Sequence, residues 1–283
     1  MKSSSENTAT ASFVPRLGFS LHLLRGPNSP QYWSELEQSG ISTFELRPEL
    51  FKDPDQPDFR RRYVEMIERS GKRTASIHAP FGGACDISSL DREIRAVGIK
   101  SLKAAIDLAA ELGAPIVVLH ASAEPVLPQE RRERLGVAFD SLTELTGDLS
   151  GKGIKLAVEL LPRSCLGNRA AELQELVEPL PTEYVGYCLD TNHMMERTGE
   201  LAAKARRLAP RLLNLHISDY DGVDEKHWLP GEGVNDWVAF LRVLAEIGYR
   251  GPFNFETKLP EGTVAEQLRA LEASYDWLRT QIP

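Results

Sequence analysis

Short apolar or β-branched segments alternate with longer segments rich in Ala, Leu, Glu and Arg along almost the whole chain. The expected strands are residues 16–23, 41–47, 73–79, 115–121, 154–160, 184–190, 212–218 and 252–257. Helices are expected between them, for example over 91–112 and 235–247. Such alternation is typical of parallel α/β proteins. Because eight pairs follow one another without a linker in mid-chain, we predict an α/β fold made of a single (β/α)8 TIM barrel.

The first residues of the chain differ from the rest. Residues 1–14 are polar and rich in Ser, Thr and Ala, a composition that cannot offset the entropy lost on ordering. We therefore expect a disordered or loosely ordered tail over 1–14 and the barrel over 15–283. The tail lacks the apolar centre of a signal peptide, and no apolar run reaches the roughly 18 residues that span a bilayer. A cytoplasmic protein without membrane contact is expected.

Cysteine usage and charge narrow the function classes. Cys85, Cys165 and Cys188 form no C-x-x-C pair, which is typical of reduced thiols in a reducing compartment. The chain has 33 Lys and Arg against 41 Asp and Glu, and this net charge of −8 disfavours broad contact with nucleic acid. Basic clusters at 60–62, 131–134 and 204–207 fall within expected helices, and we interpret them as solvated helix faces. Nucleic acid is therefore not an expected partner.

Polar residues that can bind a metal or move a proton stand at the C-terminal end of every expected strand, the face on which barrel enzymes carry their chemistry. They are His22, Glu45, His78, His120, Glu159, Asp190, His216 and Glu256, and the following loops add His193, Glu225 and His227. A single histidine at a strand end is more often a hydrogen-bonded core residue, so only the number of such residues at one rim indicates a site. Converging imidazoles and carboxylates are costly to desolvate without a cation. The Glu/Asp/His/Glu set among them is rich in oxygen ligands and predicts a divalent metal ion as cofactor: Mn²⁺, Zn²⁺, Co²⁺ or Mg²⁺.

Five motifs carry a resemblance to a known family. They are LAVEL (156–160), YCLDTNH (187–193), NLHISDYDG (214–222), EKHWLPGEG (225–233) and FNFET (253–257). In this order they resemble the strand-end motifs of the xylose-isomerase-like barrels, a superfamily of sugar and sugar-phosphate isomerases and epimerases that includes metal-dependent abasic-site endonucleases. The resemblance covers about residues 16–280. It implies that Glu159, Asp190, His216 and Glu256 hold a common metal ion.

The resemblance also implies a metal-dependent isomerase or epimerase acting on a small polyhydroxylated carbonyl compound. Proton abstraction next to a carbonyl needs carboxylates that take and return the proton, and Glu159 and Glu256 suit these catalytic roles. The remaining candidates would contact substrate or further metal ions: His78, His120, His193, His227, Glu225, Lys258, Glu45 and His22. A small carbohydrate is the expected partner, and assembly into a homo-oligomer is compatible with this interpretation.

Three alternatives stay open. A lyase similar to an inosose dehydratase would use nearly the same residues. The endonuclease branch holds three zinc ions, and its additional ligands correspond to His78, His120, His193 and an Asp-x-His pair, where this chain has Glu225 and His227. The residues after His120 and after Glu159 differ from the endonuclease pattern. A barrel that binds a ligand without catalysis is the third alternative.

The segment after the seventh expected strand is the remaining feature. Ketose 3-epimerases of the family have an Arg shortly after the seventh-strand His, whereas this chain has Ser-Asp-Tyr-Asp-Gly at 218–222. Residues 218–234 form an unusually long connection, which is typical of lids and binding loops. We predict that this loop lies over the metal, with Asp219, Asp221, Asp224 and Glu225 directed towards the cation.

Overall fold

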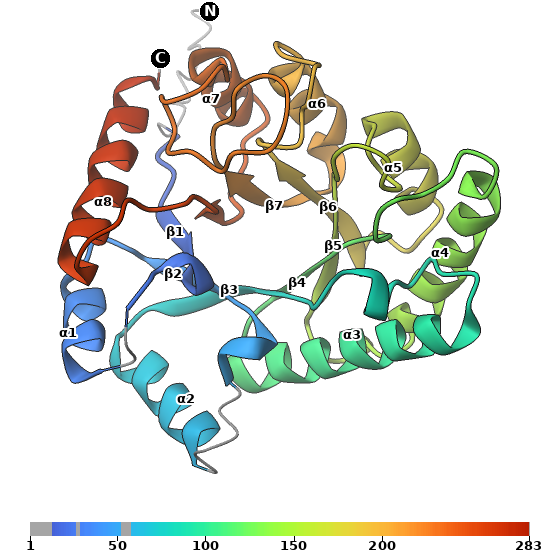
Figure 1. Ribbon diagram of the computed structural model, residues 1–283, viewed down its shortest axis with the longest axis horizontal. Helices are drawn as coiled ribbons and strands as arrows, with labels where there is room; N and C mark the ends of the chain where they lie inside the picture. Colours follow the sequence, from blue (N-terminus) through green and yellow to red (C-terminus); the bar gives the residue numbers. More distant parts are fainter. Residues whose placement is uncertain (1–12, 27–28, 52–57, 283) are drawn as a thin grey trace, which may run out of the picture.

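A computed structural model describes residues 13–26, 29–51 and 58–282 of the chain. Its eight parallel strands form a closed barrel in sequence order, with β8 pairing with β1 (Figure 1). The strands are β1 (Leu17–Ser20), β2 (Thr43–Leu46), β3 (Arg73–His78), β4 (Ile116–Leu119), β5 (Lys155–Glu159), β6 (Val185–Asp190), β7 (Leu212–Ile217) and β8 (Phe253–Phe255). The prediction of a (β/α)8 barrel is confirmed.

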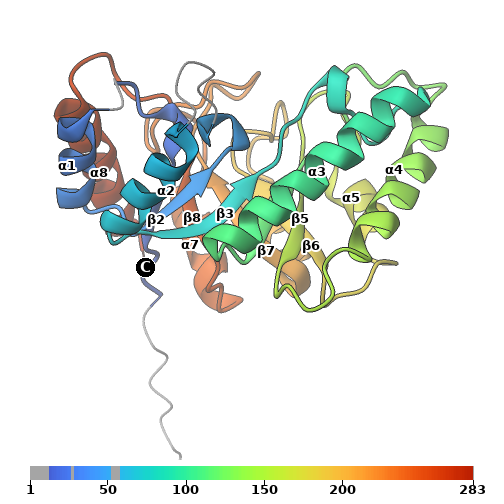
Figure 2. The same ribbon diagram turned by 90° about the horizontal axis from the view of Figure 1, so that it is seen from below.

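Helices surround the barrel and run along its outside (Figures 1 and 2). They are α1 (Pro30–Gln38), α2 (Phe59–Arg69), α3 (Arg92–Leu112), α4 (Arg131–Thr146), α5 (Ala170–Val177), α6 (Leu201–Leu208), α7 (Trp237–Glu246) and α8 (Val264–Thr280). Short 3-10 turns lie at η1 (Leu21–Leu23), η2 (Pro48–Phe51), η3 (Gly83–Cys85) and η4 (Ala209–Arg211).

Helix α3 shows how the sequence fixes these elements. The side chain of Asp91 accepts hydrogen bonds from the backbone N–H groups of Glu93 and Ile94, a cap worth about 1 kcal/mol. Gly113 ends the helix in the left-handed conformation at φ 66°, which a residue without Cβ adopts at no steric cost. Between these ends, the buried face includes Leu102, Ile106 and Ala109, as the helical spacing predicts.

Side chains alternate between the barrel interior and the helices. In β4, Ile116 and Val118 belong to a small apolar cluster with Ala157 and Cys188, whereas Val117 belongs to the large core beneath the helices. The opposite part of the interior is polar: side chains of four strands donate hydrogen bonds to the carboxylate of Glu45, namely Ser20, Ser76, Asn214 and Asn254.

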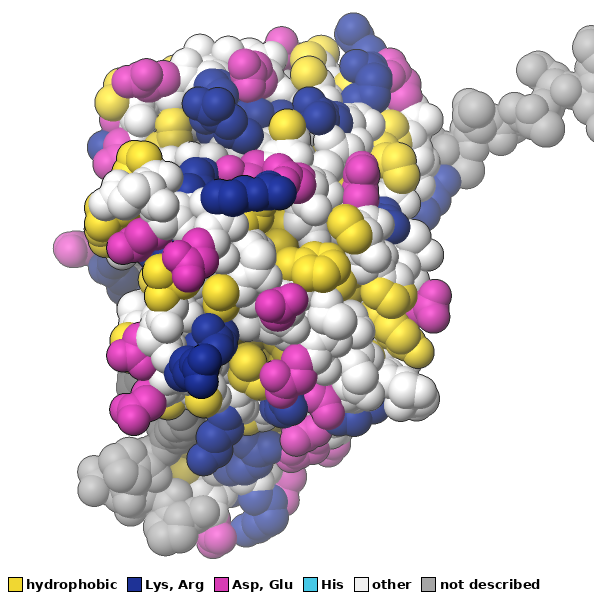
Figure 3. Space-filling model, turned by 90° about the vertical axis from the view of Figure 1, so that its right-hand side faces the viewer, with side chains coloured by type: hydrophobic (Ala, Val, Ile, Leu, Met, Phe, Trp, Pro, Cys, Tyr) yellow, Lys and Arg dark blue, Asp and Glu magenta, His cyan; other side chains and the backbone are white. Residues whose placement is uncertain are grey.

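Two basic clusters differ in part from their sequence interpretation. In the cluster at 204–207, Lys204 is only 6% exposed, and its ammonium lies 3.3 Å from the carboxylate of Glu200. Arg134 of α4 is only 8% exposed and forms an ion pair with Asp86 at 2.5 Å. Arg131 donates two hydrogen bonds to Glu172, each at 2.7 Å. The solvated face expected at 131–134 is therefore wrong for these two residues, because they join α4 to neighbouring segments. On the side of the molecule shown in Figure 3, basic and acidic side chains are interspersed, so this face has no continuous basic surface.

The ends of the chain and its cysteines complete the fold. Of the expected tail at 1–14, residues 1–12 lie outside the described residues, while Phe13 is buried in the core and Val14 is exposed. All three cysteines are free thiols. Among the described residues, no helix is both long and apolar enough to cross a membrane.

Candidate metal centre

Potential metal ligands meet at the C-terminal ends of the barrel strands. His78, Glu159 and Asp190 are the last residues of β3, β5 and β6. His216 is next to last in β7, and Glu256 directly follows β8. Since parallel strands end at the same rim of a barrel, these side chains lie close together.

Glu159 lies at the centre of this cluster. Its Oε2 atom is 3.3 Å from Nε2 of His78 and 3.3 Å from Nε2 of His120, which directly follows β4. Its Oε1 atom is 3.3 Å from Nδ1 of His193 and 3.4 Å from Nδ1 of His216. This carboxylate is only 1% exposed and has imidazoles around both oxygen atoms, so it could bridge two cations.

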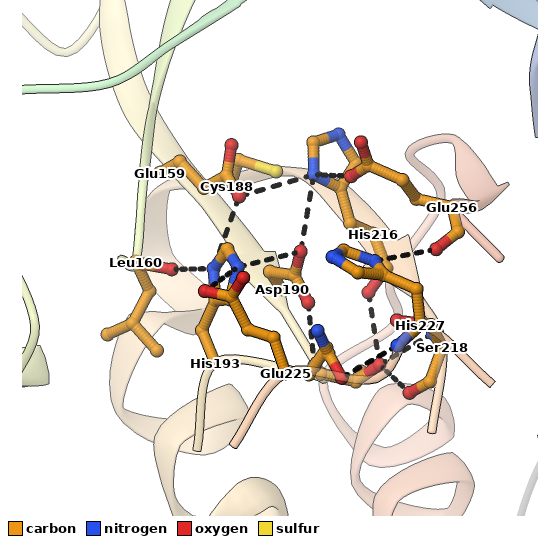
Figure 4. A network of polar contacts seen from close by, with 12 residues as sticks. Glu159, Leu160, Cys188, Asp190, His193, His216, Ser218, Glu225, His227 and Glu256 are labelled. Carbon is orange, nitrogen blue, oxygen red and sulfur yellow. Dashed lines mark hydrogen bonds and ion pairs between the residues drawn. The ribbon is translucent and has the colours of Figure 1, made fainter. Parts of the chain in front are cut away.

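Three of the four residues predicted to share a metal ion approach the fourth, His216, at its Nδ1 atom. Glu256 approaches it through Oε2 at 2.9 Å, Glu159 through Oε1 at 3.4 Å and Asp190 through Oδ2 at 3.8 Å. Figure 4 shows these carboxylates reaching His216 from different sides. The donor set therefore consists of three carboxylates and one imidazole.

Three other histidines are oriented by the backbone. In each, the Nδ1 atom lies at hydrogen-bond distance from a backbone carbonyl oxygen. The pairs are His78 with Ala79 at 2.9 Å, His193 with Leu160 at 2.9 Å, and His227 with Glu256 at 3.0 Å. Since a carbonyl oxygen can only accept, each Nδ1 atom carries a proton, and in the neutral ring each Nε2 atom has a lone pair for a metal ion. Proteins hold metal-binding imidazoles in this way.

A second group of potential ligands lies on the side of the long loop. His193, Glu225 and His227 have ligand atoms within 4.8 Å of one another, and Nε2 of His193 is 3.4 Å from Oε1 of Glu225. Glu225 also pairs with Arg163 at 3.1 Å. His227 and Arg163 have positive φ angles of 55° and 43°, and such backbone strain in non-glycine residues is concentrated at functional sites.

Buried atoms without hydrogen-bond partners support a cation here. Oε2 of Glu159, Oδ2 of Asp190 and Nδ1 of His216 have oppositely charged neighbours within 4 Å but make no hydrogen bond of regular geometry among the described residues. Burial raises the pKa of Asp190 to about 6. Burial acts in the same direction on Glu159, but His216 and His120 hold the pKa of that carboxyl well below its usual value. A divalent cation would satisfy these atoms and offset the carboxylate charges, so this donor set fits such an ion.

A cavity of about 280 Å³ opens beside the cluster and includes two wall residues that sequence reasoning missed. Arg47 donates to Oε1 of Glu256 at 3.0 Å, and its guanidinium lies 5.1 Å from the ring centre of Phe81. The Phe81 ring stacks on His120 at 4.2 Å. Arg47 directly follows β2, and this position at a strand end could have predicted that it lies at the site. Nothing in the sequence distinguishes Phe81 from other apolar residues.

A larger cavity of about 900 Å³ lies at the opposite end of the barrel, with Arg16, Thr74 and Pro252 among its lining residues. None of the potential metal-ligand groups found in the described residues contributes to its wall. The smaller cavity, which is lined by potential metal ligands, is therefore the candidate substrate site.

The loop after β7 is ordered by Asp219. This residue pairs with Trp228 as an isolated antiparallel bridge. Its carboxylate accepts hydrogen bonds from the backbone N–H groups of Tyr220, Gly231 and Asn235 and from the indole of Trp237.

Of the four loop acids expected to face the cation, only Glu225 lies in the cluster. Asp219 is buried within the loop, Asp221 accepts from the N–H groups of Val223 and Asp224, and Asp224 pairs with Arg163. The prediction is wrong for these three residues because their carboxylates accept hydrogen bonds from N–H groups of the loop or form an ion pair with Arg163.

The other predicted site residues lie in different surroundings. Lys258 is exposed and is absent from the lining of the cavity. His22 lies in the turn η1 after β1, and burial, assisted by Arg47, lowers its pKa to about 4. Glu45 is buried below the cluster, within hydrogen-bond distance of His216.

Comparison with curated proteins gives relatives over most of the chain. The uncharacterized protein y4fM of Sinorhizobium fredii is 32% identical over 231 residues, which cover 74% of this chain and 73% of the relative. An L-ribulose 3-epimerase of Mesorhizobium japonicum is 26% identical over 232 residues, 79% of this chain and 76% of that protein.

Solved structures share the fold. The crystal structure of a D-tagatose 3-epimerase-like protein superposes with a TM-score of 0.78 at 23% identity, covering 94% of this chain and 99% of the other. The family model described as "xylose isomerase-like TIM barrel" matches residues 33–281. The resemblance in the strand-end motifs is thereby confirmed, and the chain belongs to the xylose isomerase-like TIM barrel family.

Proposed function

We propose that this protein is a divalent-metal-dependent isomerase or epimerase of a small sugar, sugar phosphate or inosose, working by proton abstraction next to a carbonyl. The observation that carries the proposal is the approach of Glu159, Asp190 and Glu256 to one imidazole nitrogen of His216 at the active face of the barrel. The 3-epimerases among the relatives and structural neighbours agree with it.

The chain supplies two carboxylates for proton transfer. Glu159 and Glu256 both reach Nδ1 of His216, at 3.4 and 2.9 Å, and therefore lie close enough together to serve a single substrate carbon. One would take the proton and the other would return it. The bound divalent ion would stabilise the negative charge that develops on the substrate oxygen. Arg47 holds Glu256 through its second oxygen and thereby fixes the direction of this carboxylate.

The cavity limits the size of the substrate. About 280 Å³ is at the small end of the range in which proteins bind small molecules, so a single sugar or cyclitol fits better than a polymer. Phe81 is 46% exposed beside the cavity, where it offers an apolar surface to the C–H groups of a sugar.

Exchange of hydrogen with solvent tests the proposal. Metal-loaded protein would be incubated in D₂O with a panel of ketoses, inososes and sugar phosphates, and NMR would detect deuterium at the carbon next to the carbonyl. Glu159→Gln or Glu256→Gln should lower turnover by about 10²–10⁴-fold, the usual contribution of general acid–base catalysis. The matched control is Glu266→Gln, in the exposed capping box of α8. Turnover without any exchange would refute the proton-abstraction route, and loss of water from an inosose would identify the lyase.

One observation favours a second candidate, a multinuclear zinc endonuclease for abasic DNA. The groups His78–His120–Glu159 and Glu159–Asp190–His193 share the central carboxylate, and His193–Glu225–His227 lies next to them, so several ions could bind. Metal counting per chain together with an abasic duplex assay separates the two functions. Three zinc ions and strand cleavage would favour the nuclease, whereas absence of cleavage with ketose turnover would favour the epimerase.

A further inference from the structure

A carboxylate stands directly behind the candidate ligand His216. Glu45 is the third residue of β2 and is only 1% exposed. Its Oε1 and Oε2 atoms lie 3.0 and 3.1 Å from Nε2 of His216. The other ring nitrogen, Nδ1, faces Glu159 and Glu256. The imidazole therefore links Glu45 to the candidate metal centre.

The oxygen atoms of Glu45 are already occupied by protein donors. Beside His216, four side chains donate to them, Ser20 at 2.8 Å, Ser76 at 2.7 Å, Asn214 at 3.2 Å and Asn254 at 3.3 Å. A carboxylate offers about four lone-pair sites, and these five donors use them all. Glu45 is near enough to His216 and Glu256 to count as a potential ligand, but it has no lone pair left for a cation.

Packing alone does not require a carboxylate at this place. Elsewhere the same interior is filled by Ile116, Val118 and Ala157. Burying a carboxylate costs several kcal/mol unless it is fully hydrogen-bonded, and here the donors come from four different strands. So many buried hydrogen bonds to one carboxylate indicate that Glu45 has a function, and its contact with His216 indicates that it orients this imidazole.

We propose that Glu45 is a positioning residue of the metal centre, an inference that rests on the proposed function. Its carboxylate accepts the Nε2 proton of His216, so the ring is held in the tautomer whose Nδ1 lone pair faces the cation. A carboxylate behind a metal-bound imidazole also makes the imidazole a more basic ligand. Glu45 acts only through His216 and touches neither metal nor substrate.

The test uses Co²⁺ as the probe and the variant Glu45→Gln. Removing such a partner weakens metal binding by about 10–100-fold, so the dissociation constant from chelator competition should rise by this factor. The matched control is Asp86→Asn, which changes another buried carboxylate, one that pairs with Arg134 away from the cluster. Its dissociation constant should stay within about threefold of wild type. Nitrogen-15 NMR of metal-free wild type should show a proton on Nε2 of His216.

The outcomes are distinct. Equal Co²⁺ affinity of wild type and Glu45→Gln, or an Nε2 atom of His216 that carries no proton in the metal-free wild type, would overturn the role of Glu45. Weakening by Asp86→Asn as large as that by Glu45→Gln would also overturn it, since the effect would then follow from lost stability. A wild type that binds no Co²⁺ would refute the proposed function instead, and the tautomer would still decide whether Glu45 orients the ring.

Discussion

Replacing Asp190 by Asn should stabilise the metal-free protein while removing its response to metal. Asp190 is fully buried, and its Oδ2 atom has no hydrogen-bond partner in the described part of the chain. Burial raises its pKa from 3.8 to about 6, so above pH 6 the folded state holds a charge that the unfolded state accommodates more easily. At 1.36 kcal/mol per pKa unit, this charge costs about 3 kcal/mol of stability at pH 8, a cost that disappears below pH 4.

Thermal unfolding at pH 8 with chelator measures this effect. Asp190→Asn should melt about 5–10 °C higher than wild type, since 1 kcal/mol corresponds to about 2–4 °C for domains somewhat smaller than this one. Zinc or manganese at about 100 times the wild-type dissociation constant should then stabilise wild type by about 2.7 kcal/mol and leave the variant unchanged. A variant that gains as much from metal as wild type, or that melts lower without metal, would refute the assignment of Asp190 as a ligand held ready for a cation.

Two further predictions concern His22 and the long loop. Because burial lowers the pKa of His22 to about 4 from 6.5, its unfolded form takes up a proton between these values that the folded form does not. Stability should therefore fall as the pH decreases from 6.5 to 4, and His22→Asn should remove about 3 kcal/mol of this fall, measured by urea unfolding at both pH values with chelator. His227→Ala should lower turnover with a melting temperature unchanged within about two degrees, because His227 lines the cavity, whereas Trp228→Ala should act through stability. Wild-type turnover in a stable His227→Ala protein would remove the loop from the mechanism.

The sequence was sufficient for the fold and for the meeting of the strand ends. Alternation at period two places Glu159, Asp190 and His216 inside the barrel, and the parallel topology then places their ends at one rim. Both are local or topological properties that a pattern of residues can express. The family resemblance supplied the roles that the pattern left open.

The contacts made by individual loop side chains could not be predicted. Asp219 and Glu225 are both acidic residues of one loop. The carboxylate of Asp219 accepts hydrogen bonds from backbone N–H groups, whereas Glu225 faces His193. The same holds for Arg134, which looks like a surface charge in the sequence and is buried against Asp86. Such choices depend on which long-range partner is nearby, and the spacing of residues along the chain does not contain that information.

A crystal structure of the zinc-loaded protein, with anomalous scattering recorded at the zinc edge, would locate the metal ion itself. We expect an ion bound by Glu159, Asp190, His216 and Glu256 at about 2.0–2.2 Å, with Nδ1 as the ligand atom of His216. Further ions, if bound, should lie next to Glu159, with His78 and His120 or with His193, Glu225 and His227. An intact protein without an anomalous peak at the four predicted ligands, or with zinc only at other residues, would contradict this ligand assignment.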